Sequence, residues 1–175
     1  DSNNNRLSET DPSGNTVSYG YDSRNNIISF KDPLGNVTSL TYTNFGKIQS
    51  IRDSKGNTKN YTYDSRGNLI VVTDPSGNSA RFSYRTDGHL ASFIDFNGKT
   101  TTFNYDSLGR LIEVINPLGN AVRYGYDILN QVIFVTDASG TTYYNYSPIG
   151  KLIDITNAKG NKTRYEYDYN GRIIR

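Results

Sequence analysis

The side chains that most often carry chemistry are scarce in this chain of 175 residues. It has no Cys, no Met, no Trp and one His, His89. Without Cys the chain has no disulfide framework and no thiolate site for zinc or iron–sulfur clusters, and a single His rules out a multi-histidine site. The patterns G-x-S-x-G, H-E-x-x-H, Walker A and G-x-G-x-x-G are all absent. We therefore expect no catalytic residue, no metal site and no cofactor.

The charged residues are balanced, with 19 Lys and Arg against 17 Asp and Glu and a net charge of +2. So small an excess gives no field that would hold nucleic acid or an anionic membrane. Arg81 and Arg123 recur on one strand face, but Glu113 and Glu166 dilute them. No apolar run approaches the roughly 18–20 residues of a membrane span. We expect no nucleic-acid partner and no membrane span, and we interpret His89 as a solvated strand start.

Aspartates recur in the pattern D-P-x-G-N, three positions before a Gly. Pro supplies the φ angle of the second turn position, the Asp side chain can accept a backbone N–H two residues on, and Gly adopts positive φ. The pattern predicts a type I turn followed by a Gly bulge. Carboxylates for calcium or acid–base chemistry are the weaker alternative. The structural turn glycines of this column are Gly14, Gly35, Gly56, Gly77, Gly98, Gly119, Gly140 and Gly160.

A second turn column and a tyrosine column repeat with the same period. The second turn holds Gly at six positions and Asn25 and Asn130 at two, and Asn tolerates positive φ best among other residues. Y-x-Y precedes it, and the second tyrosine is at Tyr21, Tyr42, Tyr63, Tyr84, Tyr105, Tyr126, Tyr146 and Tyr167. The spacing is 21 residues with one step of 20. We place the missing residue between Gly140 and Tyr144, in a strand where a bulge is lost.

The segments between turns have the length and alternation of β-strands. Val17, Tyr19 and Tyr21 alternate with small polar residues, which predicts one aromatic and one wet face. In the second strand of each repeat the second position is always aliphatic, and so are most residues at the third; the fifth is also mostly aliphatic, as with Leu111 at the second position and Val114 at the fifth. A regular strand puts the second and fifth positions on opposite faces. Either a bulge at the preceding Gly rotates the second position inward, or both faces are partly covered.

These repeats predict an all-β fold. We expect a single array over residues 1–175, with eight 21-residue hairpin repeats beginning near 11, 32, 53, 74, 95, 116, 137 and 157 and a partial repeat at 1–10. About sixteen antiparallel strands would form one sheet whose second tyrosines make a structural ladder. Twist and an aromatic face require it to curl, so we expect a curved, spiralling sheet that is part of a shell or tube. Core packing of the tyrosines is favoured over a carbohydrate groove.

The unit D-P-x-G-N-x-x-x-Y-x-Y-D-x-x-G-R-L-I resembles the YD repeat of Rhs proteins, of the B and C components of insecticidal Tc toxins, of contact-inhibition toxins and of teneurins. The resemblance covers about residues 11–175. It implies a spiral β-shell that encloses a C-terminal polypeptide, usually a toxin, and in teneurins a shell used for adhesion. We therefore predict a non-enzymatic structural segment of an extracellular shell or stalk, secreted or on a bacterial surface. The absence of Met suggests an excised section of wall.

Two other functions stay open. One is an adhesion module or filament that recognises surface glycan or protein through Tyr143 and Tyr169, the two tyrosines outside the ladder columns. The other is a self-cleaving enzyme, but the core region that the resemblance associates with cleavage is not seen. The expected partners are neighbouring repeats of the parent chain or end-to-end copies, which would cover the edges at Ser2–Thr10 and Arg172–Arg175. An enclosed toxin polypeptide is the partner that the resemblance implies.

Overall fold

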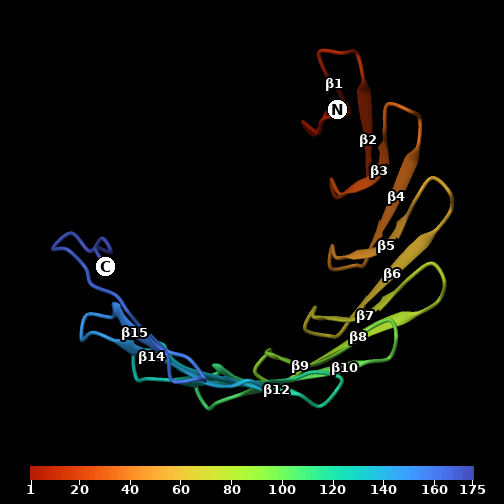
Figure 1. The fold of residues 1–175 in the computed structure, drawn as a ribbon. Helices are drawn as coiled ribbons and strands as arrows, with labels where there is room; N and C mark the ends of the chain where they lie inside the picture. The colour runs from red at the N-terminus through yellow and green to blue at the C-terminus, as the bar shows by residue number, and fades with distance from the viewer. The chain divides into compact units, whose positions relative to one another are not determined.

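A computed structural model describes residues 1–175 and consists of strands and turns, with no helix that could cross a membrane (Figure 1). The strands alternate in most places between six residues before one kind of turn and five before the other. Their bounds are β1 Ser8–Thr10, β2 Thr16–Tyr21, β3 Ile27–Lys31, β4 Val37–Tyr42, β5 Ile48–Arg52, β6 Thr58–Tyr63, β7 Leu69–Thr73, β8 Ser79–Tyr84, β9 Leu90–Ile94, β10 Thr100–Tyr105, β11 Leu111–Ile115, β12 Ala121–Tyr126, β13 Val132–Asp137, β14 Gly140–Tyr146, β15 Leu152–Thr156 and β16 Lys162–Arg164.

The strands form one sheet in sequence order, with β1 and β16 at its two ends. Neighbouring strands pair antiparallel, as β2 does with β3 and β14 with β15. Because β1 does not pair with β16, the sheet is not closed. The prediction of an all-β fold with about sixteen antiparallel strands in one sheet is confirmed. How that sheet curves over its full length remains a prediction.

Two kinds of turn alternate along the chain, and both have the predicted backbone. We call the turns that begin at Asp11 and its equivalents turn A, and those that begin at Asp22 and its equivalents turn B. In the first turn A the Gly14 N–H donates to the Asp11 carbonyl at 3.0 Å, and the φ of Gly14 is +84°. The turn B residues Asn25 and Asn130 have φ of +63° and +64°. Both therefore take the left-handed conformation that the sequence predicts.

The N-terminal residues form one more turn B, which sequence reasoning missed. Asn4 has φ of +61°, and its N–H donates to the Asp1 carbonyl at 3.2 Å. The Asp1 carboxylate accepts the N–H groups of Asn3 and Asn5. Asn4 lies 21 positions before Asn25, so extending the Asn and Gly column backward would have found it.

The single short step in the period lies in a turn A, which corrects the placement inside a strand. Here Asp137 pairs with Gly140 and Thr136 with Thr141, so only Ala138 and Ser139 connect β13 to β14. In the other turns A, one residue follows Gly before the strand begins, as Asn15 follows Gly14. The missing residue is this one. The turn has lost its bulge, while both strands keep their alternation.

A bulge explains the aliphatic pattern of the second strands. In β10–β11, Tyr105 pairs with Leu111 and Asn104 with Glu113, so Ile112 is the extra residue, and Phe103 then pairs with Val114. Positions two and five thus lie opposite two residues of the same aromatic face. The same shift occurs in five other hairpins. The extra residue is position three of the strand and not the preceding Gly, so the first of our two alternatives holds with its bulge three residues further on.

The chain divides into two compact units, Asp1–Ser83 with Ile94–Gly98, and Tyr84–Phe93 with Lys99–Arg175. In the first unit the most buried side chains are Val72 at 7% exposed and Ala80 at 2%, which face each other across β7 and β8. In the second unit only Asp154 is buried, at 8%. The ladder tyrosines are half-buried throughout. Each unit is therefore a single layer of sheet without a central core, and its half-buried side chains are spread along the aromatic face.

Candidate functional site

In six of the eight repeats, the second tyrosine of the Y-x-Y column links its hairpin to the preceding one. The Tyr63 hydroxyl donates to the Ile48 carbonyl at 2.9 Å. Pairing of β5 with β6 ends at Ser50 and Asn60, so Ile48 lies beyond the ladder, at a point where the strands no longer pair. The side chain thus continues the inter-strand hydrogen bonding where the backbone stops.

This link recurs in both units with nearly constant geometry. Tyr21, Tyr42, Tyr126, Tyr146 and Tyr167 donate to the carbonyls of Arg6, Ile27, Leu111, Val132 and Leu152 at 2.8, 2.7, 2.7, 3.0 and 2.8 Å. Burial raises the pKa of Tyr42, Tyr63, Tyr126 and Tyr146, which keeps these hydroxyls protonated as donors. Of the two remaining ladder tyrosines, Tyr84 ends β8 and Tyr105 ends β10.

A second column connects the hairpins at the same edge. The residue after the Gly or Asn of turn B reaches over the following turn B. Arg110 donates from Nη1 to the Asp127 carbonyl at 2.9 Å, and its guanidinium carbon lies 4.8 Å from the centroid of the Tyr126 ring. The Lys151 ammonium lies 5.0 Å from the Tyr167 ring. Because cations are attracted to aromatic faces, these contacts hold the ladder rings from the turn side.

His89 belongs to this column. Its ring packs 4.8 Å from the Tyr105 ring, and its Nδ1 lies 3.2 Å from Oδ1 of Asp87. Its side chain is 42% exposed. A nearby Arg85 guanidinium lies 5.7 Å from the same tyrosine ring. The histidine thus lies where Arg110 and Lys151 lie in their repeats, and it contacts the tyrosine as they do.

The aspartates at the start of the turns are engaged by their own turns. Asp74 accepts N–H groups from Ser76 and Asn78 on Oδ1 and the Asn78 amide on Oδ2, at 2.8 to 2.9 Å. The Asn78 side chain, followed by that residue's backbone N–H, lowers the pKa of Asp74. In the same way, a hydrogen bond from the side chain of the Asn four residues on is the main cause that lowers the pKa of Asp11, Asp22, Asp32, Asp53 and Asp64. These carboxylates are ionised acceptors that close turns.

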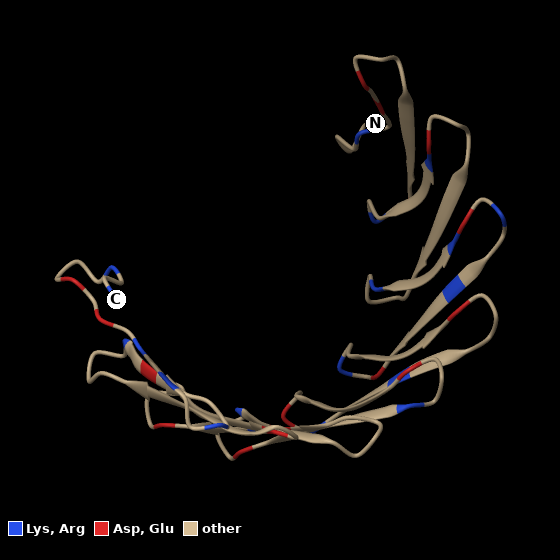
Figure 2. Cartoon of the chain, in the orientation of Figure 1, with Lys and Arg blue, Asp and Glu red and all other residues tan.

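The remaining acidic residues are spread out. No group of three or more His, Asp and Glu side chains is placed to hold a metal ion. Figure 2 shows Lys and Arg interspersed with Asp and Glu along the strands and turns of each unit. Cross-strand ion pairs occur on the wet face, with Arg123 Nε 2.8 Å from Glu113 and Lys162 Nζ 3.1 Å from Asp154. The surface therefore has no single-sign patch that points to an ionic ligand.

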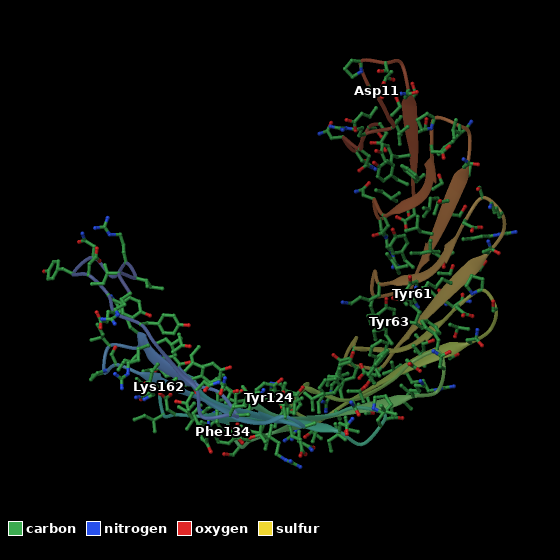
Figure 3. The ribbon with its side chains drawn as sticks, viewed as in Figure 1. Asp11, Tyr61, Tyr63, Tyr124, Phe134 and Lys162 are labelled. Atoms are coloured by element: carbon green, nitrogen blue, oxygen red, sulfur yellow. The ribbon has the colours of Figure 1, made fainter.

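The two tyrosines outside the ladder lie apart from one another. Tyr143, on β14, is 56% exposed and packs against Phe134, with ring centroids 6.5 Å apart. Phe134 in turn covers Gly125, and Figure 3 shows it on the side of the ribbon away from Tyr124. Tyr169 is fully exposed in the last turn B. A binding role for Tyr143 and Tyr169 remains a proposal.

The eight turn A glycines all have positive φ, between +78° and +120°. Most of them have open space around them, except Gly140, where a Cβ would lie 2.8 Å from the Cβ of Ala158. A Cβ on Gly14, Gly77, Gly98, Gly119 or Gly160 would meet nothing within 4 Å, whereas one on Gly109 would lie 2.9 Å from the His89 ring. Turn A thus needs Gly for its backbone conformation, and some turns B need it also to admit the side chain of the previous repeat.

The sequence matches the model of the teneurin YD-shell over residues 2–136, and that of the RHS repeat over residues 146–175. No curated protein matches it. Among solved structures, the Photorhabdus luminescens Tc holotoxin pore is similar with a TM-score of 0.67 and 14% identity, over 91% of this chain and 12% of that one. The complex TcdB2-TccC3 is similar with a TM-score of 0.62 and 17% identity, over 97% of this chain and 12% of that one.

TcdB2-TccC3 without its hypervariable C-terminal region is a third similar structure, with a TM-score of 0.61 and 18% identity over 93% of this chain and 10% of that one. At these identities the likeness to the solved structures shows the fold. The chain spans only about a tenth of the length of each of them. Because the first family model covers most of the chain, and the repeats carry the tyrosine column that gives the unit its name, the chain belongs to the teneurin YD-shell family.

Proposed function

We propose that this chain is a section of the wall of an extracellular shell that encloses a polypeptide, and that it catalyses no reaction. The observation that carries the proposal is the set of six tyrosine hydroxyls that join a hairpin to the one before it. These hydrogen bonds hold successive hairpins together along the array and do not converge on a single site. A wall requires such connections between its repeats. The shell families that the sequence matches support this function.

The exposure of the sheet also supports a wall. In each unit the aromatic face is half-buried with no second layer of the chain on it. A one-layer sheet gains burial when something else covers this face. An enclosed polypeptide, as in a toxin-carrying shell, would provide that cover. Neighbouring repeats of a longer chain are the partners we propose for the edges of β1 and β16.

The way the candidate groups are used supports the proposal that the chain catalyses no reaction. Turn aspartates such as Asp74 accept three hydrogen bonds within their own turns, and ladder tyrosines such as Tyr63 donate to main-chain carbonyls. None of these groups is left as an acid, base or nucleophile facing a cavity. The purified chain should therefore remain intact on prolonged incubation, without self-cleavage.

Limited proteolysis of the full-length parent protein tests the enclosure. The polypeptide that follows the repeats should resist protease while the repeats are folded, and should be cut once about 4 M urea opens the array. The same polypeptide expressed alone is the control. Equal cleavage rates inside the parent protein and alone would contradict the proposal, because an enclosed segment cannot reach the protease.

A further inference from the structure

A groove lies on the aromatic face of the first unit, between the turn B at 43–46 and the turn B at 64–67. Its volume is 590 Å³, which falls within the roughly 300–1,000 Å³ of pockets that hold small ligands. Tyr61 and Tyr63 lie on the same side of the β6 ribbon in Figure 3. The side chains that matter below are Tyr42, Phe45, Lys47, Gln49, Tyr61 and Tyr63.

The repeat departs from its own pattern at this groove. The bulge position of the second strand is Ile or Ala in every other repeat, as at Ile70 and Ile112, but it is Gln49 here. Turn B also begins with Thr43 where Asp22 and Asp64 begin the flanking turns, although Arg85 and Ser147 replace Asp in two other repeats, so Gln49 is the change that no other repeat shares. A wall built by repetition requires neither change. Both of these residues nevertheless line the same groove.

Several groups in the groove have no partner within the protein. The hydroxyls of Tyr42 and Tyr63 are used by the links to Ile27 and Ile48. In contrast, the Tyr61 hydroxyl, the Gln49 amide and the Lys47 ammonium make no hydrogen bond or ion pair. These three groups can therefore donate to or accept from a ligand.

An aromatic side chain completes the groove. Phe45 is 91% exposed at the tip of its turn. The Cε of Lys47 would lie 3.7 Å from a Cβ on Gly67, so its stem lies across the next turn at the wall of the groove. The carboxylate of Asp64 is occupied by its own turn, where it accepts from Arg66 and Asn68. The groove thus offers a flat apolar ring, an amide, a hydroxyl and an unpaired cation.

We propose that this groove binds one pyranose ring of a glycan. A pyranose has an apolar C–H face that packs on an aromatic ring and a rim of hydroxyls that an amide and a phenol can bind. Lys47 adds attraction for a sugar carboxylate, so a uronic acid binds more tightly than the neutral sugar. This site goes beyond the wall function and does not rest on it. Because it lies on the face that we propose an enclosed polypeptide covers, the two occupants exclude one another at this groove, and the sugar binds where the face is uncovered.

Saturation-transfer NMR on the whole chain tests the site, with the methyl pyranosides of glucose, galactose, mannose, N-acetylglucosamine and glucuronic acid as probes. At least one should receive saturation at its ring protons, with glucuronide favoured over glucoside. Phe45→Ala should weaken binding by at least about tenfold. Gln49→Ile, which restores the residue of the other repeats, should do the same. Lys47→Gln should remove the preference for glucuronide and leave glucoside binding intact.

The matched control is Leu108→Ala, which removes an exposed apolar side chain at the position of Phe45 in another turn B. It should bind as the unchanged chain does, and a thermal melt of each variant confirms folding. Saturation of none of the five sugars would overturn the proposal. So would binding that survives both Phe45→Ala and Gln49→Ile, or that falls equally in Leu108→Ala. Acetate competing as well as glucuronide would reduce the site to a carboxylate contact and overturn the sugar.

Discussion

At the scale of single residues, one tyrosine hydroxyl in each of six repeats makes the hydrogen bond that a backbone ladder would otherwise make. The strands of neighbouring hairpins stop pairing before they reach turn B, as β5 and β6 do after Ser50 and Asn60. The Tyr63 hydroxyl then binds the Ile48 carbonyl. A phenylalanine fills the same space but leaves that carbonyl without its donor. Replacing Tyr with Phe should therefore affect stability at the second tyrosine position of Y-x-Y and not at the first.

Tyr63→Phe should lower the free energy of unfolding of the chain by about 1 kcal/mol, the net contribution of one hydrogen bond. Tyr61→Phe is the matched control, because it lies two residues away on the same face and its hydroxyl has no partner. It should change the free energy by less than about 0.3 kcal/mol. Urea unfolding followed by circular dichroism measures both. Equal losses would show that ring packing, and not the hydroxyl, carries the link.

The turn aspartates predict sensitivity to acid. Their pKa values are lowered in the folded chain, so the unfolded chain binds protons first as the pH falls. Their contribution to stability is complete above the unfolded pKa of about 4 and is lost as the pH falls through the lower folded pKa. The urea concentration at the midpoint of unfolding should therefore decrease as the pH is lowered from about 6 to about 3.

Replacing Asp11, Asp32, Asp53 and Asp74 together with Asn tests this cause. Asn already begins the turn at Asn116, where its side-chain oxygen accepts from Leu118 and Asn120 at 2.9 and 3.0 Å. The substituted turns should therefore form, while the fall of the urea midpoint with pH becomes shallower. An unchanged slope would place the acid sensitivity in other carboxylates.

The residue scale is also where sequence reasoning reached furthest and where it failed. Asp, Pro and Gly act on their own turn, so the turns and the positive φ of Asn25 and Asn130 followed from local pattern. The acceptor of each tyrosine did not, because a main-chain carbonyl leaves no mark in the sequence. Gln49 could have been found, since it is polar in a column that is otherwise aliphatic.

At the scale of elements, the bulge and the turn decide which face each side chain takes. A sequence shows the spacing of Leu111 and Val114 but not where the extra residue lies, since a bulge at either of two points restores the same face. The residue on the neighbouring strand also explains why Gly lies between the two tyrosines of Y-x-Y at two positions. Gly125 lies opposite Phe134, whose ring occupies the place of a Cβ, whereas Gly20 lies opposite the smaller Ser29.

Gly125→Ala should therefore destabilise the chain by about 1–3 kcal/mol through overpacking against Phe134. Gly20→Ala is the control and should be close to neutral, because the Ser29 hydroxyl can rotate away. In a chain that already carries Phe134→Ala, adding Gly125→Ala should cost little further stability, because the ring that it would clash with is gone. A double-mutant cycle measures this difference. A loss in Gly125→Ala that persists without the Phe134 ring would point to the backbone instead.

The short turn at Asp137–Gly140 gives a second test of elements. An Asn inserted after Gly140 would restore the residue present at Asn15 and should leave the free energy of unfolding within about 0.5 kcal/mol. Inserting the same Asn between Thr142 and Tyr143 should cost at least about 2 kcal/mol, because it moves one part of β14 to the opposite face. Thermal melts of the two insertions compare them directly. Equal tolerance would show that the register of β14 is not fixed by its faces.

At the scale of the whole molecule, repetition is what made the fold predictable. Each hairpin contacts its neighbours in sequence, so a local unit and its period determine the strand order. The curvature of a complete shell depends on small rotations that add up over many repeats, and no single residue specifies it. The identity of whatever covers the aromatic face likewise lies outside a pattern of 21 residues.

Electron cryomicroscopy of the full-length parent protein tests the central proposal most directly. The tyrosine face of residues 1–175 should border an interior that contains polypeptide density, and β1 and β16 should each pair with a neighbouring strand. The ladder tyrosines should keep their hydrogen bonds to the preceding hairpin. A map in which this face is open to solvent, with both edge strands unpaired, would contradict the assignment of the chain as a section of shell wall.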